Sequence, residues 1–170
     1  VHELPPPFDL DAYAPIDAVL QARGRAEWRG FAPADRELVL PAVAAWCKPA
    51  EGMTAVDLQA RLAEIDANSQ RFLAAQAGLD LLLLPTLPMA GFAATLPGPV
   101  EGVPLAHTGY TALFNQTGQP AATVGWGLDP TGLPIGVQVA GPRFSDRLVL
   151  QAAMLLEQAR PWTPSWPVIG

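Results

Sequence analysis

Several residue types on which common enzymes depend are scarce in this sequence of 170 residues. It contains one Cys (Cys47), one Lys (Lys48), two His and three Ser. A single Cys excludes an intrachain disulfide and favours a reducing, cytoplasmic compartment. One Cys and two widely separated His do not provide the ligand spacing of a zinc site, so we expect no metal. A P-loop is excluded because Lys48 is followed by Pro49 rather than by Ser or Thr.

Long apolar runs and an excess of positive charge are also missing. The longest apolar stretch, Leu38 to Cys47, is shorter than a bilayer-spanning helix and is interrupted by Pro41. No positively charged segment followed by an apolar run opens the chain. The net charge of -6 and a pI of about 4.7 argue against a general nucleic-acid-binding surface. We therefore expect neither a membrane nor a nucleic acid as a partner.

What the chain does contain is enough apolar material for one folded domain. Half of the residues are hydrophobic and 15% are charged, which is incompatible with a disordered chain. The first residue is Val1 rather than Met, which favours a processed or truncated piece of a longer protein. We find no internal repeat and no sign of a second domain, so residues 1–170 are expected to form a single unit.

Residues 1–78 are predicted to be mostly helical. A helical pattern runs from Ala14 to Ala26, and a second helix opens at Pro33. Pro41 removes a backbone hydrogen bond from the second helix, so a kink or a split is expected there.

A third helix is expected to begin at Thr54. Asp57 three residues later completes a sequence that resembles a capping box, with Asp in place of the usual Glu. The expected buried face comprises Leu58, Leu62, Ile65, Ser69 and Phe72. Gly78 stands where a left-handed residue would end the helix.

Residues 79–170 are predicted to contain the strands and a closing helix. The apolar run Leu81–Pro85 indicates a strand buried on both faces. Ala121–Trp126 and Ile135–Ala140 are expected to form a hairpin around the turn Asp129-Pro130-Thr131-Gly132. The pattern as a whole predicts an α/β fold, with a mixed β-sheet flanked by α-helices.

The closing helix is predicted to start at Ser145 or Asp146. Its expected inward-facing residues are Leu148, Leu150, Met154 and Leu155. The tail from Pro161 to Gly170 is expected to be irregular.

No self-sufficient catalytic group emerges from these elements. Ser69 falls within a helix, Ser145 at a helix start and Ser165 in the tail, and none has the Gly-x-Ser-x-Gly setting of a hydrolase nucleophile. A reactive Cys47 with His2 or His107 would lack a motif for oxyanion donors. Cys47 is instead expected to be a buried apolar thiol on a helix.

Three ordered segments carry more specific information. The first is Asp80-Leu81-Leu82-Leu83-Leu84-Pro85-Thr86-Leu87-Pro88, and the second is Phe114-Asn115-Gln116-Thr117-Gly118-Gln119-Pro120-Ala121-Ala122. The third is Gly132-Leu133-Pro134-Ile135-Gly136-Val137-Gln138-Val139-Ala140-Gly141, and the closing helix follows it. In this order and at these intervals, they resemble the C-terminal part of the amidase signature family. Residues 1–7 also resemble the strand that precedes the long helical segment of that family.

The resemblance implies an activity whose catalytic residues are absent here. Members share a Ser-Ser-Lys triad upstream of this part, and hydrolyse carbon–nitrogen amide bonds through an acyl-Ser intermediate with no cofactor. The chain contains no Ser-Ser pair and would be inactive alone. The expected partners are a small-molecule amide and either the N-terminal part of the same domain or a second copy. We expect the latter two because cutting a shared sheet exposes apolar surface.

The resemblance also implies which residues form the C-terminal wall of the substrate pocket. These substrate-binding candidates are Thr86, His107, Tyr110, Asn115 and Thr117. Gly118 is expected to adopt a positive φ, and Gln138 to satisfy backbone groups between strands.

Two other classes of function remain open at this point. One is a non-catalytic α/β binding or scaffold module, which the missing triad favours. The other is the A-type subunit of a glutamine amidotransferase from the same family. An upstream Lys followed by a Gly/Ser-rich Ser-Ser segment would identify a family enzyme.

Overall fold

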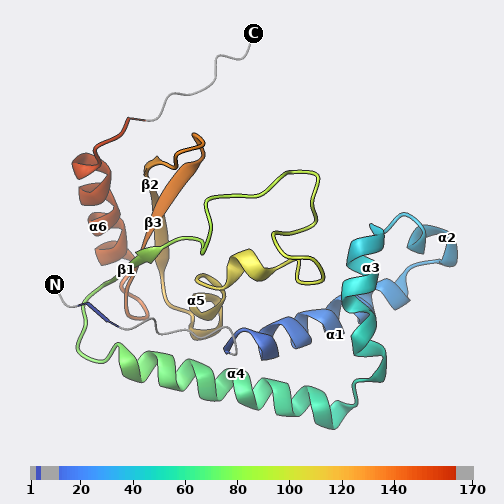
Figure 1. Ribbon diagram of the computed structural model, residues 1–170. Helices are drawn as coiled ribbons and strands as arrows, with labels where there is room; N and C mark the ends of the chain where they lie inside the picture. Colours follow the sequence, from blue (N-terminus) through green and yellow to red (C-terminus); the bar gives the residue numbers. More distant parts are fainter. Residues whose placement is uncertain (1–2, 5–11, 164–170) are drawn as a thin grey trace.

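The computed structural model describes residues 3–4 and 12–163 (Figure 1). The helices are α1 (Ala14–Gly30), α2 (Pro33–Arg36), α3 (Pro41–Cys47), α4 (Ala55–Ala75), α5 (Ala112–Thr117) and α6 (Asp146–Ala159), with 3-10 helices η2 (Lys48–Gly52) and η3 (Ala106–Thr108). The strands are β1 (Leu82–Pro85), β2 (Ala121–Leu128) and β3 (Pro134–Ala140). Of the strand expected at residues 1–7, residues 3–4 are described and belong to no strand, and the rest lies outside the described residues, as do residues 164–170 of the expected irregular tail.

The three strands form one small sheet in the order β1-β3-β2. β2 and β3 form the predicted hairpin, with an irregularity between Gly125 and Gly127. β1 pairs with β3, from Leu82 opposite Ala140 to Pro85 opposite Val137. The predicted α/β class is confirmed. Both pairings are antiparallel, so the mixed pairing expected for this sheet does not occur among the described strands.

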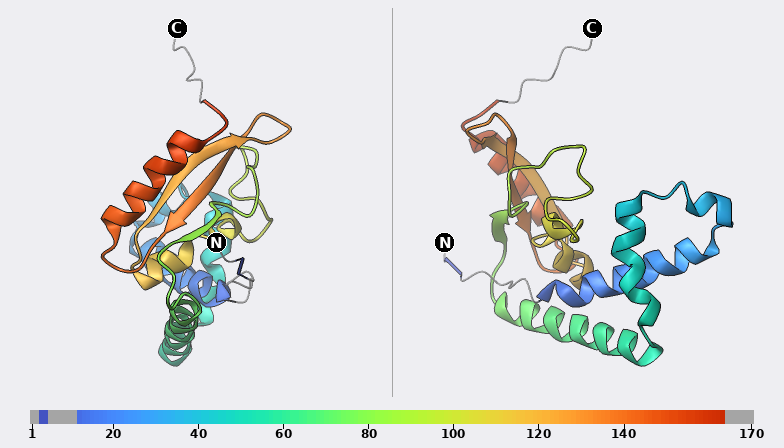
Figure 2. Two further views of the ribbon diagram at one scale, coloured as in Figure 1. Left: turned by 90° about the vertical axis from the view of Figure 1, so that its left-hand side faces the viewer. Right: turned by 45° about the vertical axis from the view of Figure 1, so that its right-hand side comes forward.

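The helices occupy the two sides of the sheet and an arm that extends from it. α6 and α5 lie on opposite sides of the strands (Figures 1 and 2), and α6 packs against β2 and β3. α1 packs along α4, and α3 folds back against α1 to complete the arm. Pro41 begins α3 as a helix separate from α2, which confirms the predicted split.

The hydrophobic core lies where the arm meets the sheet. Its buried members are Tyr13, Ile16, Ile65, Phe72, Ala112, Leu113, Phe114 and Ala140. The rings of Phe72 and Phe114 meet edge to face, with their centroids 5.4 Å apart. This contact joins α4 to α5 and therefore fixes the segment that carries the second sequence motif.

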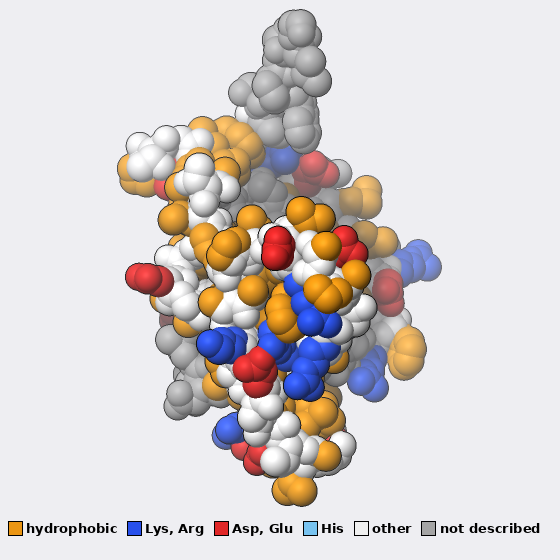
Figure 3. Space-filling view, turned by 90° about the vertical axis from the view of Figure 1, so that its right-hand side faces the viewer, with side chains coloured by type: hydrophobic (Ala, Val, Ile, Leu, Met, Phe, Trp, Pro, Cys, Tyr) orange, Lys and Arg blue, Asp and Glu red, His pale blue; other side chains and the backbone are white. Residues whose placement is uncertain are grey.

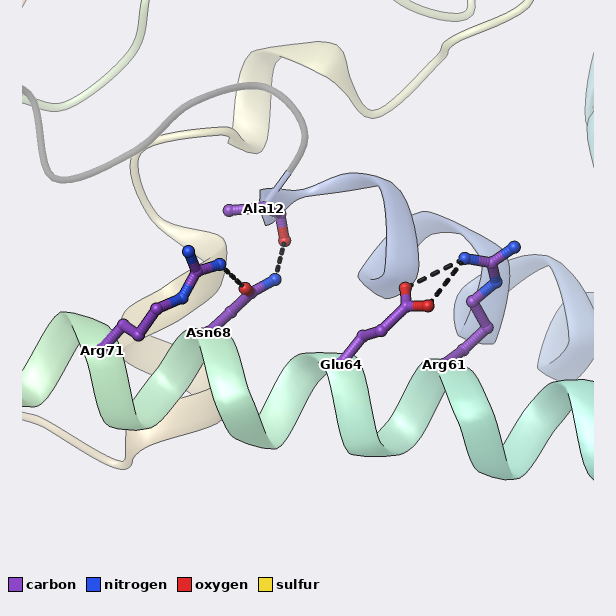
Figure 4. A network of polar contacts seen from close by, with 5 residues as sticks. All are labelled: Ala12, Arg61, Glu64, Asn68 and Arg71. Atoms are coloured by element: carbon purple, nitrogen blue, oxygen red, sulfur yellow. Dashed lines mark hydrogen bonds and ion pairs between the residues drawn. The ribbon is translucent and has the colours of Figure 1, made fainter.

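Polar contacts also tie the start of α1 to α4 (Figure 4). The Asn68 side-chain amide donates to the backbone carbonyl of Ala12 at 3.3 Å, and Arg71 donates to the Asn68 carbonyl oxygen. One turn earlier, Arg61 and Glu64 form an exposed ion pair on the same helix. Exposed pairs of this kind stabilise a helix only weakly. Of the contacts in Figure 4, the bond from Asn68 to Ala12 is therefore the one that joins α4 to the segment leading into α1.

The predicted capping box forms at the start of α4. The Thr54 hydroxyl accepts from the Asp57 backbone N–H at 3.1 Å, and the Asp57 carboxylate accepts from the Thr54 N–H at 2.9 Å. At the other end of the helix, Gly78 has φ of +83°, as expected for a residue that reverses the chain.

The capping box makes stability depend on pH. Hydrogen bonds from Thr54 lower the pKa of the Asp57 carboxyl below its ordinary 3.8. A lowered folded pKa stabilises the fold above the unfolded pKa, and this contribution is lost as the pH falls through the folded value. We expect Asp57→Asn to flatten the fall in unfolding free energy below about pH 4, measured by urea denaturation.

Asp66→Asn is the matched control for this variant. Asp66 is exposed on the same helix and forms no hydrogen bond within residues 12–163. An equal flattening in both variants would show that the capping box is not the cause.

Three predictions about burial are wrong. Leu62, expected on the buried face of α4, is 40% exposed, although Ile65, Ser69 and Phe72 of that face are buried as expected. β1 is not buried on both faces, because Leu83 is 54% exposed. Leu83 shares its side of the sheet with Val139, but α6 covers β2 and β3 and leaves edge strand β1 open.

The predicted inward face of α6 is also wrong. Leu148, Leu150, Met154 and Leu155 are between 40% and 66% exposed, whereas Val149 is 2% exposed and faces the sheet. α6 is apolar on most sides, and periodicity alone does not show which side meets the strands. Ser145 does precede α6, but its hydroxyl donates to the Pro142 carbonyl at 2.6 Å instead of capping the helix.

Candidate functional site

The end of β1 places Thr86 beside the other two strands. Its backbone N–H donates to the Gly136 carbonyl at 3.1 Å, which continues the β1–β3 pairing. Its hydroxyl lies 3.3 Å from the Thr123 hydroxyl on β2, across the intervening β3. A Cβ atom at Gly136 would lie 2.7 Å from the Thr86 hydroxyl oxygen, so only glycine lets these two side chains meet.

A hydrogen bond from Gln138 ties the backbone of Tyr110 to the same face of the sheet. Side chains alternate between faces along a strand, so Gln138 projects on the face of Gly136, Thr86 and Thr123. The Gln138 side-chain amide donates to the Tyr110 backbone carbonyl at 3.3 Å. This bond links the sheet to the segment between η3 and α5. Gln138 thus satisfies a backbone group, but of this segment and not of a neighbouring strand.

His107 belongs to η3 and packs against the long loop after β1. Its ring centroid lies 5.4 Å from that of Phe92, at an interplanar angle of 51°. The Nδ1 atom of His107 is buried and has no hydrogen-bond partner among the described residues. His107 is thus a half-buried imidazole whose Nδ1 atom is enclosed without a partner in this part of the chain.

The two candidates on α5 have different surroundings. Asn115 is exposed, and within the described part of the chain its side chain forms no hydrogen bond. Thr117 is 1% exposed, and its hydroxyl lies 2.9 Å from the Leu113 carbonyl and 3.0 Å from the Gln119 side-chain oxygen. The structure therefore places Asn115 on the surface and Thr117 inside the protein.

Gln119 is a residue whose role sequence reasoning missed. It is 8% exposed, and its amide donates to the Gly141 carbonyl at 3.0 Å and to the Gln76 side chain at 3.1 Å. Gly118 before it has φ of +65°, as predicted, and turns the chain from α5 toward β2. Its place between Gly118 and Pro120, inside the second sequence motif, is the signal that could have revealed it.

The described residues do not assemble a nucleophile with a base. Within residues 3–4 and 12–163 the buried Ser69 hydroxyl has no partner, and the Ser145 hydroxyl donates to a backbone carbonyl. Cys47 is 1% exposed and donates to the Ala44 carbonyl at 3.5 Å, as expected for a buried helical thiol. His2 and Ser165 lie outside the described residues.

Two further classes of site are not found within the described ranges. In residues 3–4 and 12–163, no three His, Cys, Asp or Glu side chains gather to hold a metal ion. The same residues contain no helix with both the length and the apolar character needed to cross a membrane.

Comparison with known proteins relates this arrangement to amide-bond enzymes. The family model described as Amidase matches residues 35–150, more than half of the chain. The chain is 36% identical over 107 residues to a 6-aminohexanoate-cyclic-dimer hydrolase of Pseudomonas sp., covering 54% of this chain and 21% of that protein. It is 38% identical over 87 residues to the A subunit of the glutamyl-tRNA(Gln) amidotransferase of Granulibacter bethesdensis, covering 50% of this chain and 17% of that protein.

Comparison of the fold with solved structures also finds amide-bond enzymes. A bacterial aryl acylamidase of the amidase signature enzymes superposes with a TM-score of 0.67 at 25% identity, over 89% of this chain and 34% of that structure. The chain thus covers about a third of the length of this solved structure and about a fifth of the length of these two relatives. The chain belongs to the amidase signature family.

Proposed function

We propose that residues 1–170 are the C-terminal part of a single amidase domain. The complete enzyme attacks the carbonyl carbon of an amide with a Ser hydroxyl, and the carbon–nitrogen bond breaks to release ammonia or an amine. Water then hydrolyses the acyl-Ser ester to the carboxylic acid and restores the hydroxyl. The Ser-Ser-Lys residues lie upstream of Val1, and no metal or organic cofactor takes part.

The observation that carries this proposal is the match of residues 35–150 to the amidase family. Two features of the chain support it. The Ser and Cys residues that the structure describes have no base beside them. The chain also corresponds to about a third of the length of a complete family structure, which leaves room for the catalytic residues elsewhere.

Within the proposal, this part supplies one wall of the substrate pocket. Thr86 and Tyr110 border one face of the sheet, and His107 lies on the adjoining segment with its Nδ1 unpaired among described residues. Asn115 is the exposed polar candidate on α5. Thr117 is enclosed, so we assign it a positioning role through Gln119. A cytoplasmic location rests on the lone Cys47 and stays a prediction.

The proposal predicts that catalysis and the serine nucleophile depend on the upstream part. The 170-residue chain should neither hydrolyse amides nor react with a fluorophosphonate, whereas the complete protein should do both. Alanine substitution of the upstream nucleophilic Ser should abolish labelling and turnover together. Mass spectrometry of the labelled peptide identifies the modified residue.

Stoichiometric labelling of Ser69, Ser145 or Ser165 in the isolated chain, with turnover lost in its Ala variant, would overturn the proposal. Absence of both activities from the complete protein would favour the binding or scaffold module instead.

The second candidate is the A-type subunit of a glutamine amidotransferase. The 38% identity to the Granulibacter bethesdensis protein favours it. Glutamine hydrolysis by the complete protein that rises on addition of partner subunits would distinguish this candidate from an amidase that acts alone.

A further inference from the structure

Residues 22–58, at the end of the molecule opposite α6, carry as many Lys and Arg as Asp and Glu, in a protein of net charge -6. Figure 3 faces this end, formed by α2, α3 and the start of α4, and Lys and Arg side chains gather near the middle of the face. Trp28 connects two of these cations, and one of them also contacts the backbone of Arg29. Arg25 and Arg36 contact Trp28, and the Arg36 guanidinium donates to the Arg29 carbonyl at 2.7 Å.

Trp28 holds two guanidinium groups together. The Cζ atoms of Arg25 and Arg36 lie 3.8 Å and 4.8 Å from the centroid of its ring. The Nε atoms of both arginines and the indole Nε1 of Trp28 are buried, and none has a hydrogen-bond partner in the part of the chain described. All three groups are donors, so the cluster lacks acceptors.

The charges of this cluster are only partly neutralised. Arg25 pairs with Glu51, but neither Arg29 nor Arg36 forms an ion pair within residues 12–163. The Arg25 side chain is 12% exposed, which keeps its charge out of the solvent. Arg25 and Arg29 lie one turn apart on α1, and Glu51 is their one ion-pair partner among the described residues, so together they leave a positive charge that a bound anion would neutralise.

A pocket of about 180 Å³ opens beside the cluster. Arg25 and Arg29 line it from α1, Met53 from the end of η2, and Thr54 and Ala55 from the start of α4. The first N–H groups of a 21-residue helix add positive potential, although Asp57 already occupies the Thr54 N–H. This pocket is separate from Thr86, His107 and Tyr110, none of which lines it.

We infer that this pocket binds a small oxyanion, either a phosphoryl or a carboxylate group, through Arg25 and Arg29. The planar guanidinium groups match the paired oxygens of both ligand classes, and the pocket supplies a partly enclosed place for one such group. The site is independent of the amide chemistry proposed above. Glu51 already pairs with Arg25, so it competes with the anion for this guanidinium group and lowers the affinity of the pocket.

The test titrates the 170-residue chain with inorganic phosphate and, separately, with malonate, each at an ionic strength held constant with sodium chloride. Isothermal titration calorimetry should show saturable binding of at least one anion. Arg29→Gln should weaken that binding about tenfold, since it removes a charge-assisted hydrogen bond at an exposed residue on which no ion pair depends. Comparing the two titrations shows which oxyanion class the pocket prefers.

Arg61→Gln is the matched control. Arg61 is an exposed arginine on α4 that pairs with Glu64 and does not line the pocket. Unchanged affinity in this variant, with weakened binding in Arg29→Gln, supports the inference. Binding of neither anion, binding lost equally in both variants, or binding unaffected by Arg29→Gln would overturn it.

Discussion

Analytical ultracentrifugation of the 170-residue chain at low micromolar concentration is expected to show dimers or larger assemblies rather than an 18.0 kDa monomer. The reason is the apolar surface on the α6 side of the sheet. Leu83 is 54% exposed, Phe144 is 94% exposed, and Leu150 and Met154 are each 60% exposed. Burying roughly 400 Å² of such surface stabilises an assembly by about 10 kcal/mol before the entropy of association is subtracted.

The conformation of Phe144 supports an interface at this place. Phe144 has φ of +65°, the one positive φ among the described residues other than glycine. A left-handed conformation costs about 1–2 kcal/mol for a residue with a Cβ atom. In the isolated chain no packing of the ring offsets this cost in free energy, because the ring is almost fully exposed. We therefore expect a covering surface, from the upstream part of the domain or from a second copy.

Substitutions on α6 distinguish association through this surface from nonspecific hydrophobic association. Leu150→Gln combined with Met154→Gln should shift the sedimentation profile toward the monomer, since both side chains lie away from the sheet. Leu38→Gln is the control, because Leu38 is 82% exposed on the helical arm. Dissociation by Leu38→Gln alone, or a cooperatively folding monomer of the unaltered chain, would contradict the prediction.

The features that could be predicted from sequence are those set by neighbours along the chain. Thr54 and Asp57 cap α4 because the two residues are three positions apart, whatever the rest of the protein does. Pro41 splits two helices because its ring removes a local hydrogen bond. The β2–β3 hairpin follows from two apolar runs around a four-residue turn. Local chemistry decides each of these features.

Features that depend on distant contacts could not be predicted in the same way. The orientation of α6 depends on which of its apolar sides meets β2 and β3, and Val149 occupies that side. The exposure of Leu83 depends on how far α6 extends across the sheet. In the candidate site, the position of Thr86 at the end of β1 could be predicted from its sequence motif. Its contact with Thr123 could not, because Gly136 on a third strand makes that contact possible.

Gln119→Leu is expected to lower the unfolding free energy by about 2–4 kcal/mol. Leu has a similar volume but cannot donate, so the Gly141 carbonyl and the Gln76 side chain lose the partner to which they are bonded at 3.0 Å and 3.1 Å. Each buried polar group without a partner costs about 1–3 kcal/mol. Because Gln119 joins the ends of α4 and α5 to the end of β3, the loss should also loosen the segment that carries Asn115.

Gln116→Leu makes the same chemical change without this network. Gln116 lies on α5, is exposed, and forms no hydrogen bond within the described ranges, so its substitution should change the unfolding free energy by less than about 0.5 kcal/mol. Both variants should be compared by urea denaturation at one fixed protein concentration, because association contributes to apparent stability. Equal effects at the two positions would show that hydrophobicity alone is responsible.

A double-mutant cycle assigns the effect to the network itself. The Thr117 hydroxyl lies 3.0 Å from the Gln119 side-chain oxygen and is enclosed with it. Thr117→Val should therefore destabilise the wild-type chain more than it destabilises Gln119→Leu, with a coupling energy of about 0.5–3 kcal/mol. Additive effects would mean that Thr117 acts through the backbone carbonyls of Leu113 and Phe114 and not through Gln119. In that case, the role of Thr117 in positioning Gln119 would have to be abandoned.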